Sequence, residues 1–259
     1  MRLVKGLLTR CTEVMELLAM APSGVSEVAA RLDMPKSAVH RLLQELCSLG
    51  WVQQMPDGRY RAALRFALLG RDVLRQTGLP DLAQPMLDRL ARETRELVRL
   101  TVATPTGLAW LAFAQGATSG LVYQPEMAGP VVLHATANGK AYLASLDDEQ
   151  VILRVSSVLG VVRPTARTIV SPDVLLTELR QVRVQGFAVA NEEAEAGVAA
   201  VAVAIGAGPA AGTVSVAGPR IRMPDKRLPE LAVLLQDVAR ALSSLRPFQP
   251  LETIACALN

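Results

Sequence analysis

The chain has 259 residues, of which 51% are hydrophobic and 20% charged, and its formal net charge at pH 7 is +3. This length suits two domains that each bury a core. No apolar run has the length and flanks of a membrane span, and the first residues lack a signal-peptide cleavage pattern. We therefore expect a cytoplasmic protein that does not associate with a membrane.

Cysteine usage argues against a disulfide framework and against a zinc site. The three cysteines, Cys11, Cys47 and Cys256, are odd in number, lie far apart and form no CxxC pair. We expect reduced, mostly buried thiols, with redox sensing as the alternative. The sequence predicts neither a bound metal nor a cofactor.

Positive charge is concentrated near the N-terminus. Residues 1–77 contain 11 Lys and Arg against 7 Asp and Glu, a balance of +4. Residues 78–259 contain 16 against 17, a balance of −1. An excess of basic residues in one part of a chain is typical of a nucleic-acid-binding domain, so the N-terminal part is the candidate for this role.

The N-terminal part has the element order of a winged helix-turn-helix. Residues 5–20 predict a leading helix, and residues 26–32 predict a second helix with Ser26 at its N-cap. The Asp-Met-Pro sequence at 33–35 interrupts it, since proline cannot continue a helix but suits the first turn of the next one. Residues 36–49 then repeat apolar side chains at helical spacing, including Leu49.

The helix at residues 36–49 is the candidate recognition helix. Its polar face can reach base edges or phosphates in the DNA major groove, and it carries Lys36, Ser37, His40, Arg41 and Gln44. Two short strands flank a turn at residues 55–58 and predict a wing, on which Arg59 and Arg61 would lie against phosphates. Each residue alone is equally typical of a solvated helix face, and the complete order of elements favours DNA binding.

The remaining residues predict a second domain with mixed secondary structure. A linking helix at residues 64–79 is followed by a boundary at Gly78 and Pro80. Helices are expected at about 81–96, 136–146, 147–159, 172–185 and 228–245, and the fourth has Ser171 as its N-cap and ends at Gly186. Alternating or apolar runs predict strands at 97–103, 108–114, 120–126, 187–190, 198–205 and 213–218. This mixture predicts an α+β sensor domain with a central antiparallel sheet.

Four segments of the sequence resemble the IclR-type bacterial transcription regulators, the family named for the isocitrate lyase regulator. They are MPKSAVHRLLQEL with GWV and PDGRYR, LHATANGKAYLA at 133–144, GFAVANEE with GVAAVAV at 186–203, and TVSVAGP at 213–219. They stand in the family's order and spacing over nearly the whole chain. The resemblance implies a winged helix-turn-helix DNA-binding domain at residues 1–63, a linker helix at 64–79 and a GAF-like effector-binding domain at 80–259.

The resemblance also implies a function and its partners. It implies a transcriptional regulator, more often a repressor, that binds double-stranded operator DNA as a homodimer or homotetramer and responds to a small organic effector. Ala38 stands where the family commonly has threonine, and its methyl group can contact a thymine. The full set of expected DNA-binding residues is Ser26, Lys36, Ser37, Ala38, His40, Arg41, Gln44, Arg59 and Arg61.

The resemblance places an effector pocket in the C-terminal domain. The matching residues form two walls, the start of a helix and the last strands: Tyr123, Val131, Thr136, Ala137, Asn138, Ala190, Ala200, Ser215 and Ala217. A helix N-terminus can seat a carboxylate. Family members that bind small keto acids often have an acid at position 190, a cysteine at 200 and a serine at 217.

All three of these positions are alanine in this chain. Because polar anchors are lost and volume is gained, we expect a larger or more apolar ligand, an aromatic or alicyclic acid. The alternative is that the alanines only pack the sheet and that the pocket is small or unused.

An enzyme with an N-terminal accessory domain is the competing class. A Ser/His/Asp arrangement would depend on His134, since His40 already belongs to the candidate recognition helix. The sequence has no GxSxG motif, phosphate-binding loop or metal-ligand cluster, so we predict that the protein is not an enzyme and that His134 bonds a loop. A third class is a ligand- or partner-binding protein whose helix-turn-helix does not bind DNA, which salt-dependent DNA binding would exclude.

Overall fold

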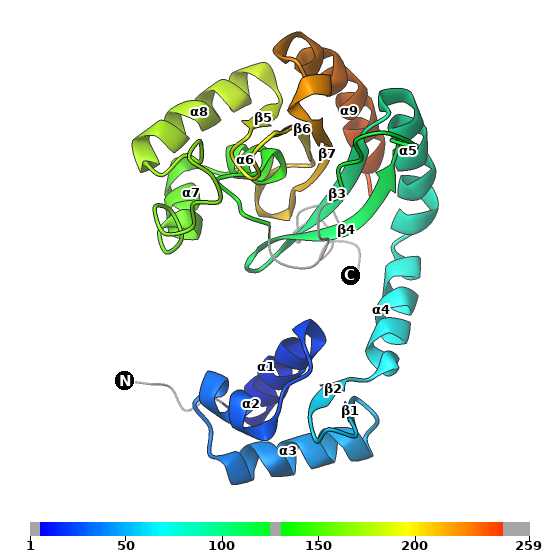
Figure 1. Ribbon diagram of the computed structural model, residues 1–259, viewed down its shortest axis with the longest axis vertical. Helices are drawn as coiled ribbons and strands as arrows, with labels where there is room; N and C mark the ends of the chain where they lie inside the picture. Colours follow the sequence, from blue (N-terminus) through cyan, green and yellow to red (C-terminus); the bar gives the residue numbers. More distant parts are fainter. Residues whose placement is uncertain (1–5, 125–130, 246–259) are drawn as a thin grey trace, which may run out of the picture. The chain divides into compact units, whose positions relative to one another are not determined.

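The protein is described here from a computed structural model, which describes residues 6–124 and 131–245. The chain forms two compact units, Met1–Gln76 and Thr77–Asn259, and each is considered by itself (Figure 1). Cys256 lies outside the described residues. Cys11 and Cys47 are half-buried free thiols, and burial raises the pKa of both.

The N-terminal unit has the predicted order of helices and strands. Its elements are α1 (Leu7–Met20), α2 (Val25–Leu32), α3 (Lys36–Ser48), β1 (Val52–Gln54), β2 (Tyr60–Ala62) and α4 (Leu64–Gln76). The two strands pair in antiparallel fashion, with Gln54 opposite Tyr60 across the turn. A small core of apolar side chains from α1, α2, α3 and the ribbon holds the unit together, including Val14, Leu18, Val28, Val39, Leu43 and Tyr60.

Two details of the N-terminal prediction are wrong. The N-cap of α2 is Gly24 and not Ser26, because the Glu27 carboxylate accepts a hydrogen bond of 2.8 Å from the Gly24 N–H and the helix begins at Val25. Ser26 therefore lies in the first turn, with an exposed side chain. Helix α3 ends at Ser48, so Leu49 has left the apolar stripe and is 54% exposed.

The C-terminal unit is built on a five-stranded antiparallel sheet, as predicted for its fold class. The strand order is β4-β3-β7-β6-β5. The strands are β3 (Leu97–Thr104), β4 (Gly107–Gln115), β5 (Ala188–Asn191), β6 (Val198–Ile205) and β7 (Gly212–Pro219). The hairpin predicted between β6 and β7 is present, with Ile205 opposite Gly212.

Helices cover both faces of this sheet (Figure 1). They are α5 (Leu79–Thr94) and α9 (Leu228–Leu242) on one face, and α6 (Ala137–Ala144), α7 (Asp148–Val155) and α8 (Pro172–Gln185) on the side of the other. Three short 3-10 turns, η1 (Gly208–Ala210), η2 (Arg220–Arg222) and η3 (Asp225–Arg227), complete the described elements.

The two faces of the sheet differ in side-chain size because successive residues of a strand point to opposite sides. The face toward α5 and α9 is built from large aliphatic side chains, such as Val98, Leu100, Val201, Val214 and Val216. The face toward α6 is built largely from alanines: Ala188, Ala190, Ala200, Ala202 and Ala217. Small side chains allow α6 to approach the sheet closely.

Two details of the C-terminal prediction are also wrong. Residues 120–124 form no strand, and 125–126 lie outside the described residues, so the predicted meander has only two strands in the described part of the chain. Leu82, predicted on the apolar side of its helix, is 53% exposed. Pro80, predicted to mark the domain boundary, lies in the first turn of α5, where proline is tolerated, close to the division between Gln76 and Thr77.

Candidate DNA-binding surface and effector site

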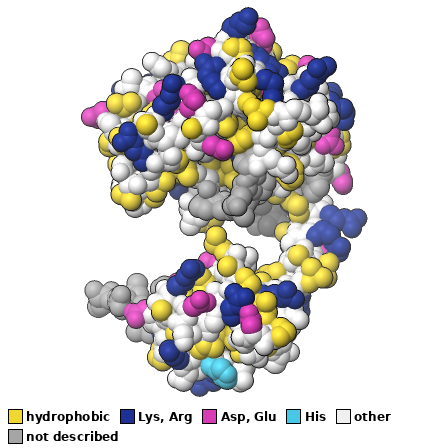
Figure 2. All heavy atoms as spheres, viewed as in Figure 1, with side chains coloured by type: hydrophobic (Ala, Val, Ile, Leu, Met, Phe, Trp, Pro, Cys, Tyr) yellow, Lys and Arg dark blue, Asp and Glu magenta, His cyan; other side chains and the backbone are white. Residues whose placement is uncertain are grey.

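Helix α3 separates an apolar face from a polar face. Val39, Leu42, Leu43 and Leu46 are buried in the core of the unit. The opposite face exposes five of the predicted DNA-binding residues: Lys36, Ser37, His40, Arg41 and Gln44. Ala38, which lies beside them, is half-buried. Figure 2 shows Lys, Arg and histidine side chains at the surface of this unit. The polar face of α3 is therefore open to a macromolecular ligand.

The wing holds its two arginines in defined positions. Nε of Arg59 lies 2.7 Å from a carboxylate oxygen of Asp57, and the Arg59 N–H donates to the same group at 3.0 Å. This contact lowers the pKa of Asp57. Arg61 donates to Oε1 of Gln53 on the neighbouring strand at 3.0 Å. Both guanidinium groups are exposed, so they can present donors to phosphate.

A contact that was not predicted from the sequence joins the wing to α4. Arg65 donates to the carbonyl oxygen of Leu49 at 2.6 Å, and its guanidinium lies 4.3 Å from the ring centroid of Trp51. The Trp51 and Phe66 rings pack with centroids 4.9 Å apart. The start of α4 is thereby fastened to the end of the recognition helix. The rest of α4 exposes apolar side chains, including Leu64, Leu68, Leu69 and Val73.

A small cavity lies against the alanine face of the sheet, beside the start of α6. Its volume is about 20 Å³, close to that of a single water probe. Five predicted effector-binding residues line it: Tyr123, Thr136, Ala137, Ala190 and Ala200. The sequence reasoning missed four other lining residues, Arg99, Ala194, Glu195 and Val198. As described, the cavity is too small for an organic acid, so ligand binding requires it to widen.

The other four predicted effector-binding residues do not line this cavity. Asn138, Ser215 and Ala217 are fully buried between α6 and the sheet, and Val131 packs in a separate apolar cluster with Leu108 and Tyr142. Asn138 donates to Oγ1 of Thr213 at 2.8 Å. Among the described residues, Oδ1 of Asn138 and Oγ of Ser215 have no hydrogen-bond partner. Two polar atoms are thus buried and unsatisfied between α6 and the sheet.

The start of α6 is already capped. Oγ1 of Thr136 accepts a hydrogen bond from the Gly139 N–H at 3.0 Å and donates to the Val132 carbonyl at 2.9 Å. The Thr136 hydroxyl is therefore occupied within its own turn. Thr136 lines the cavity, but because its hydroxyl already caps α6, this helix terminus offers an incoming carboxylate fewer free hydrogen-bond donors than an uncapped terminus would.

Among the described residues, Arg99 is the one positively charged side chain that lines the cavity. It lies on β3, directly opposite Ser215 on β7, and is only 7% exposed. Its guanidinium lies 4.1 Å from the ring centroid of Trp110. Burial lowers the pKa of Arg99, against smaller opposite effects of Tyr123 and Glu195. The sequence did contain a signal for this residue: Arg99 is a charged residue within the alternating run LVRLTVA, at a position where strand alternation predicts an inward-facing side chain.

Tyr123 lines the cavity and packs against the alanine cluster. Its main-chain carbonyl accepts a hydrogen bond of 2.9 Å from the side chain of Gln115. Burial raises the pKa of Tyr123 to about 12, with Arg99 acting in the opposite direction. The phenol is therefore neutral at physiological pH and can donate a hydrogen bond.

His134 has the structural role predicted for it. It is fully buried, and its Nε2 atom lies 2.8 Å from the carbonyl oxygen of Val162 in the segment between α7 and α8. No group of three His, Cys, Asp or Glu side chains in residues 6–124 and 131–245 could hold a metal ion. Over the same residues, no helix has both the length and the apolar character needed to cross a membrane.

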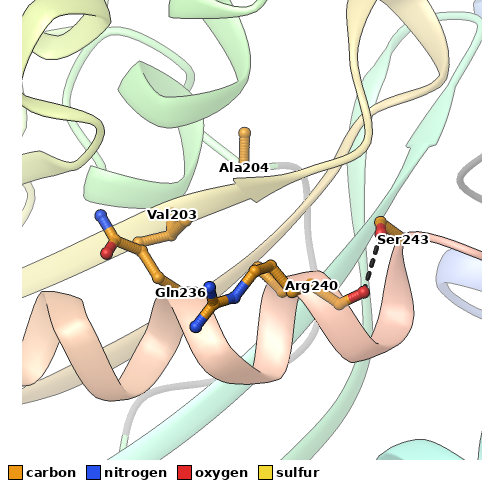
Figure 3. A pocket seen from close by; sticks show the side chains of 6 residues that line it. Val203, Ala204, Gln236, Arg240 and Ser243 are labelled. Atoms are coloured by element: carbon orange, nitrogen blue, oxygen red, sulfur yellow. Dashed lines mark hydrogen bonds between the residues drawn. The ribbon is translucent and has the colours of Figure 1, made fainter.

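A second hollow of about 280 Å³ lies on the other face of the sheet, between β6 and α9 (Figure 3). It is lined by Val203, Ala204, Gln236, Ala239, Arg240 and Ser243, none of which was predicted to bind an effector. Figure 3 shows the Ala204 side chain pointing away from α9, as strand alternation requires. Arg240 pairs with Asp237 on its own helix, so this hollow offers no unpaired charge.

Together, a winged helix-turn-helix with an exposed polar face on α3 and an α+β unit with a small cavity define the class of DNA-binding proteins that join a winged helix-turn-helix to a second domain. The chain matches the family described as IclR helix-turn-helix domain over residues 7–56 and the family described as bacterial transcriptional regulator IclR C-terminal over residues 71–244. The protein belongs to the IclR family of bacterial transcription regulators, and it is not an enzyme.

Relatives of known name support this assignment. The chain is 32% identical over 246 residues to the HTH-type transcriptional regulator BhcR of Paracoccus denitrificans, covering 91% of this chain and 85% of the relative. It is 28% identical to the transcriptional repressor IclR of Escherichia coli over 243 residues, covering 91% and 88%.

Solved structures show the same fold. The IclR of Thermotoga maritima matches with a TM-score of 0.63 and 26% identity, covering 91% of this chain and 98% of that one. An IclR homologue from Microbacterium hydrocarbonoxydans, solved in complex with 4-hydroxybenzoate, matches with a TM-score of 0.68 and 25% identity, covering 91% and 100%.

Proposed function

We propose that the protein represses transcription by binding operator DNA through α3 and the wing, and that a small organic acid in the C-terminal unit modulates this binding. The observation that carries the DNA-binding part is the exposed polar face of α3, which presents Lys36, His40 and Arg41 opposite a buried apolar stripe. A helix with this division fits the major groove, and the wing arginines suit the flanking phosphates. Relatives that are named repressors support the proposed direction of regulation.

The proposed effector is an aromatic or alicyclic acid. The cavity beside α6 has alanine walls, namely Ala137, Ala190 and Ala200, which leave room for an apolar ring once the cavity widens. The complex of a 25% identical relative with 4-hydroxybenzoate supports an acid of this class. The Arg99 guanidinium, which lines the cavity together with the Glu195 carboxylate, supplies hydrogen-bond donors suited to the carboxylate of such an acid.

The proposed mechanism links the two binding events. Ligand in the C-terminal unit would favour one of two arrangements of a homodimer or homotetramer, and α4 would transmit the change to the spacing of the recognition helices. Because linkage is reciprocal, ligand and operator would change each other's affinity by the same factor, typically about 1 to 3 kcal/mol. A proven ligand that leaves operator affinity unchanged at saturation would exclude this mechanism.

The test of the proposed function is fluorescence anisotropy with the DNA upstream of the protein's own gene, with random DNA as the control, over a series of salt concentrations. A regulator is expected to prefer the upstream DNA by about 10³-fold or more, with an affinity that falls as salt rises. Equal and weak binding to both DNAs, with and without added acids, would contradict the assignment of this gene's upstream region as the operator.

A further inference from the structure

We propose that Arg99 is the anchor for the carboxylate of the effector, and that Glu195, which lines the same cavity, is an internal carboxylate whose charge opposes the binding of an acidic ligand. This inference rests on the proposed function, since it specifies how the effector site recognises its ligand. It extends the sequence-based expectation, which placed the carboxylate at the start of α6 and included neither residue.

The environment of Arg99 is unusual for a buried cation. Its side chain is more than nine-tenths buried, and its polar interactions are a hydrogen bond with Tyr123 and the charge of Glu195. Nε of Arg99 is buried without a hydrogen-bond partner among the described residues. Buried charges are normally paired, because desolvation makes an unpaired charge costly. The guanidinium therefore has donors to offer and lines a cavity into which a ligand can bring an anion.

The surroundings of Arg99 suit a carboxylate attached to an apolar body. The Trp110 ring covers one face of the guanidinium at 4.1 Å and leaves the edge, where the N–H donors lie, for an acceptor. On the neighbouring strand, the Ser215 hydroxyl faces Arg99 across the sheet and lacks a partner among the described residues. Most of the remaining lining is apolar, with four alanines and Val198 beside Tyr123, Thr136 and Glu195. A monocarboxylic acid with an aromatic or alicyclic ring matches this division.

Glu195 is placed to act as the internal competitor. It lines the same cavity as Arg99 and Tyr123, and its charge favours the protonated guanidinium. It also helps to raise the pKa of Tyr123, as expected for a carboxylate beside the phenol. The cavity that these side chains line measures only about 20 Å³, so a ligand that brings its carboxylate to Arg99 must displace lining side chains and places its negative charge near that of Glu195.

The loop that carries Glu195 is fixed at its base. The Glu193 carboxylate is held by the buried Lys140 at 2.8 Å, and its carbonyl oxygen accepts a hydrogen bond of 2.7 Å from Thr168. Glu192 closes the loop by accepting a hydrogen bond of 2.9 Å from the Gly197 N–H. Glu195 is exposed, and its side chain is hydrogen-bonded with Tyr123. Replacing the Glu195 side chain therefore leaves the contacts at the base of the loop in place.

The experiment uses the full-length protein and a transparent probe. Cyclohexanecarboxylate and its neutral isostere cyclohexanecarboxamide are titrated while the fluorescence of Trp110 is followed, in a Trp51→Phe background so that Trp110 is the only tryptophan. Glu195→Gln is expected to bind the carboxylate at least about tenfold more tightly than the parent, because the internal competitor is neutral. Affinity for the amide is expected to be equal in the two proteins.

Matched variants separate this effect from a general change in charge. Glu192→Gln removes the same charge from the same loop, but its side chain pairs with Arg167 and does not line the cavity, so the carboxylate should bind it as it binds the parent. Arg99→Gln is expected to lose carboxylate binding by at least about tenfold. If that variant does not fold, Arg99→Lys keeps the charge without the planar fork and is expected to bind about tenfold more weakly than the parent.

Three results would overturn the inference. They are equal carboxylate affinity in Glu195→Gln and the parent, unchanged affinity in the folded Arg99 variant, and no saturable binding by Glu195→Gln up to about 10 mM. If the protein binds its operator specifically and any of these three results is found, the proposed regulatory function stands and the proposed role of Arg99 and Glu195 is excluded. If carboxylate binding depends on Arg99 but the protein shows no specific operator binding, the role of Arg99 stands and the proposed regulatory function is excluded.

Discussion

The ammonium group of Lys140 on α6 lies 2.8 Å from a carboxylate oxygen of Glu193, in the loop between β5 and β6, and is fully buried. The same ammonium lies 2.9 Å from a carboxylate oxygen of Glu178 on α8. One buried cation therefore ties three segments together behind the cavity. Because Glu193 starts the loop that carries Glu195, this contact fixes one wall of the proposed effector site.

Removing the buried ammonium should destabilise the C-terminal unit. Lys140→Met leaves the largely buried Glu193 without a counter-charge, and breaking a buried ion pair from one side typically costs about 3 kcal/mol or more. The free energy of unfolding in urea measures this loss. The exposed Lys226→Met is the matched control, with an expected change within about 0.5 kcal/mol. Equal stability of the two variants would show that Lys140 does not hold the loop.

Glu193 also makes stability depend on pH. Burial raises its pKa above the ordinary value of 4.5, although Lys140 acts in the opposite direction. The folded state therefore holds this proton more tightly than the unfolded state. The stabilising contribution is complete below the unfolded pKa and is lost as pH rises through the folded pKa. Unfolding in urea at several pH values should show a decline in this window that Glu193→Gln lacks, and an identical pH profile for both proteins would contradict the prediction.

Two glycines are expected to respond in opposite ways to alanine. A Cβ atom at Gly139 in α6 would lie only 2.2 Å from the carbonyl oxygen of Leu133, so Gly139→Ala should destabilise the protein by about 2 kcal/mol or more. At Gly70, inside α4, a Cβ atom meets nothing within 4 Å, and Gly70→Ala should stabilise that helix by about 0.5 to 1 kcal/mol. The melting temperatures of the two variants, each compared with that of the parent, test this prediction. A Gly139→Ala variant as stable as the parent would mean that α6 can move away from the preceding turn.

Periodicity is a local property, and the features that depend on it were predictable. The recognition helix, the wing and the strands β5, β6 and β7 lie where their patterns place them. The errors occur where local preference was overridden or misread. Residues 120–124 contain a short apolar run typical of a strand but do not pair in the sheet. Ser26 has a good capping side chain, while Gly24 and Glu27 form the cap.

The candidate effector site was predictable only in part, because it joins segments that are distant in the sequence. Resemblance supplied the alanine walls, since these are read one position at a time. It supplied neither Arg99 nor Glu195, which lie about a hundred residues apart and meet only when β3 and the β5–β6 loop are brought to one cavity. It also could not show that the Thr136 hydroxyl is already used to cap α6. Such pairings arise from tertiary packing.

The contact between the wing and α4 should contribute to the stability of the N-terminal unit. Arg65→Ala removes both the hydrogen bond to the Leu49 carbonyl and the stacking on Trp51, and a loss of about 1 to 2 kcal/mol is expected. Arg75→Ala, near the end of the same helix, is a matched control with an exposed side chain. If Arg65→Ala and Arg75→Ala have the same melting temperature, the contact between Arg65 and the wing does not stabilise the N-terminal unit.

Arg41 should be a determinant of operator affinity. It is exposed on the polar face of α3, one residue after His40, so its replacement by alanine removes a long basic donor without disturbing the core. Arg41→Ala is expected to weaken binding by about 1 to 3 kcal/mol. If the Arg41 side chain contacts a phosphate, affinity falls equally for all DNA sequences, and the slope of log affinity against log salt concentration decreases by about one. If it contacts a base, the protein loses discrimination at one operator position. Arg180→Ala, which removes an equal charge from the C-terminal unit, should leave the anisotropy titration unchanged. Equal losses in the two variants would indicate a non-specific effect of net charge and would place the DNA contact elsewhere than α3.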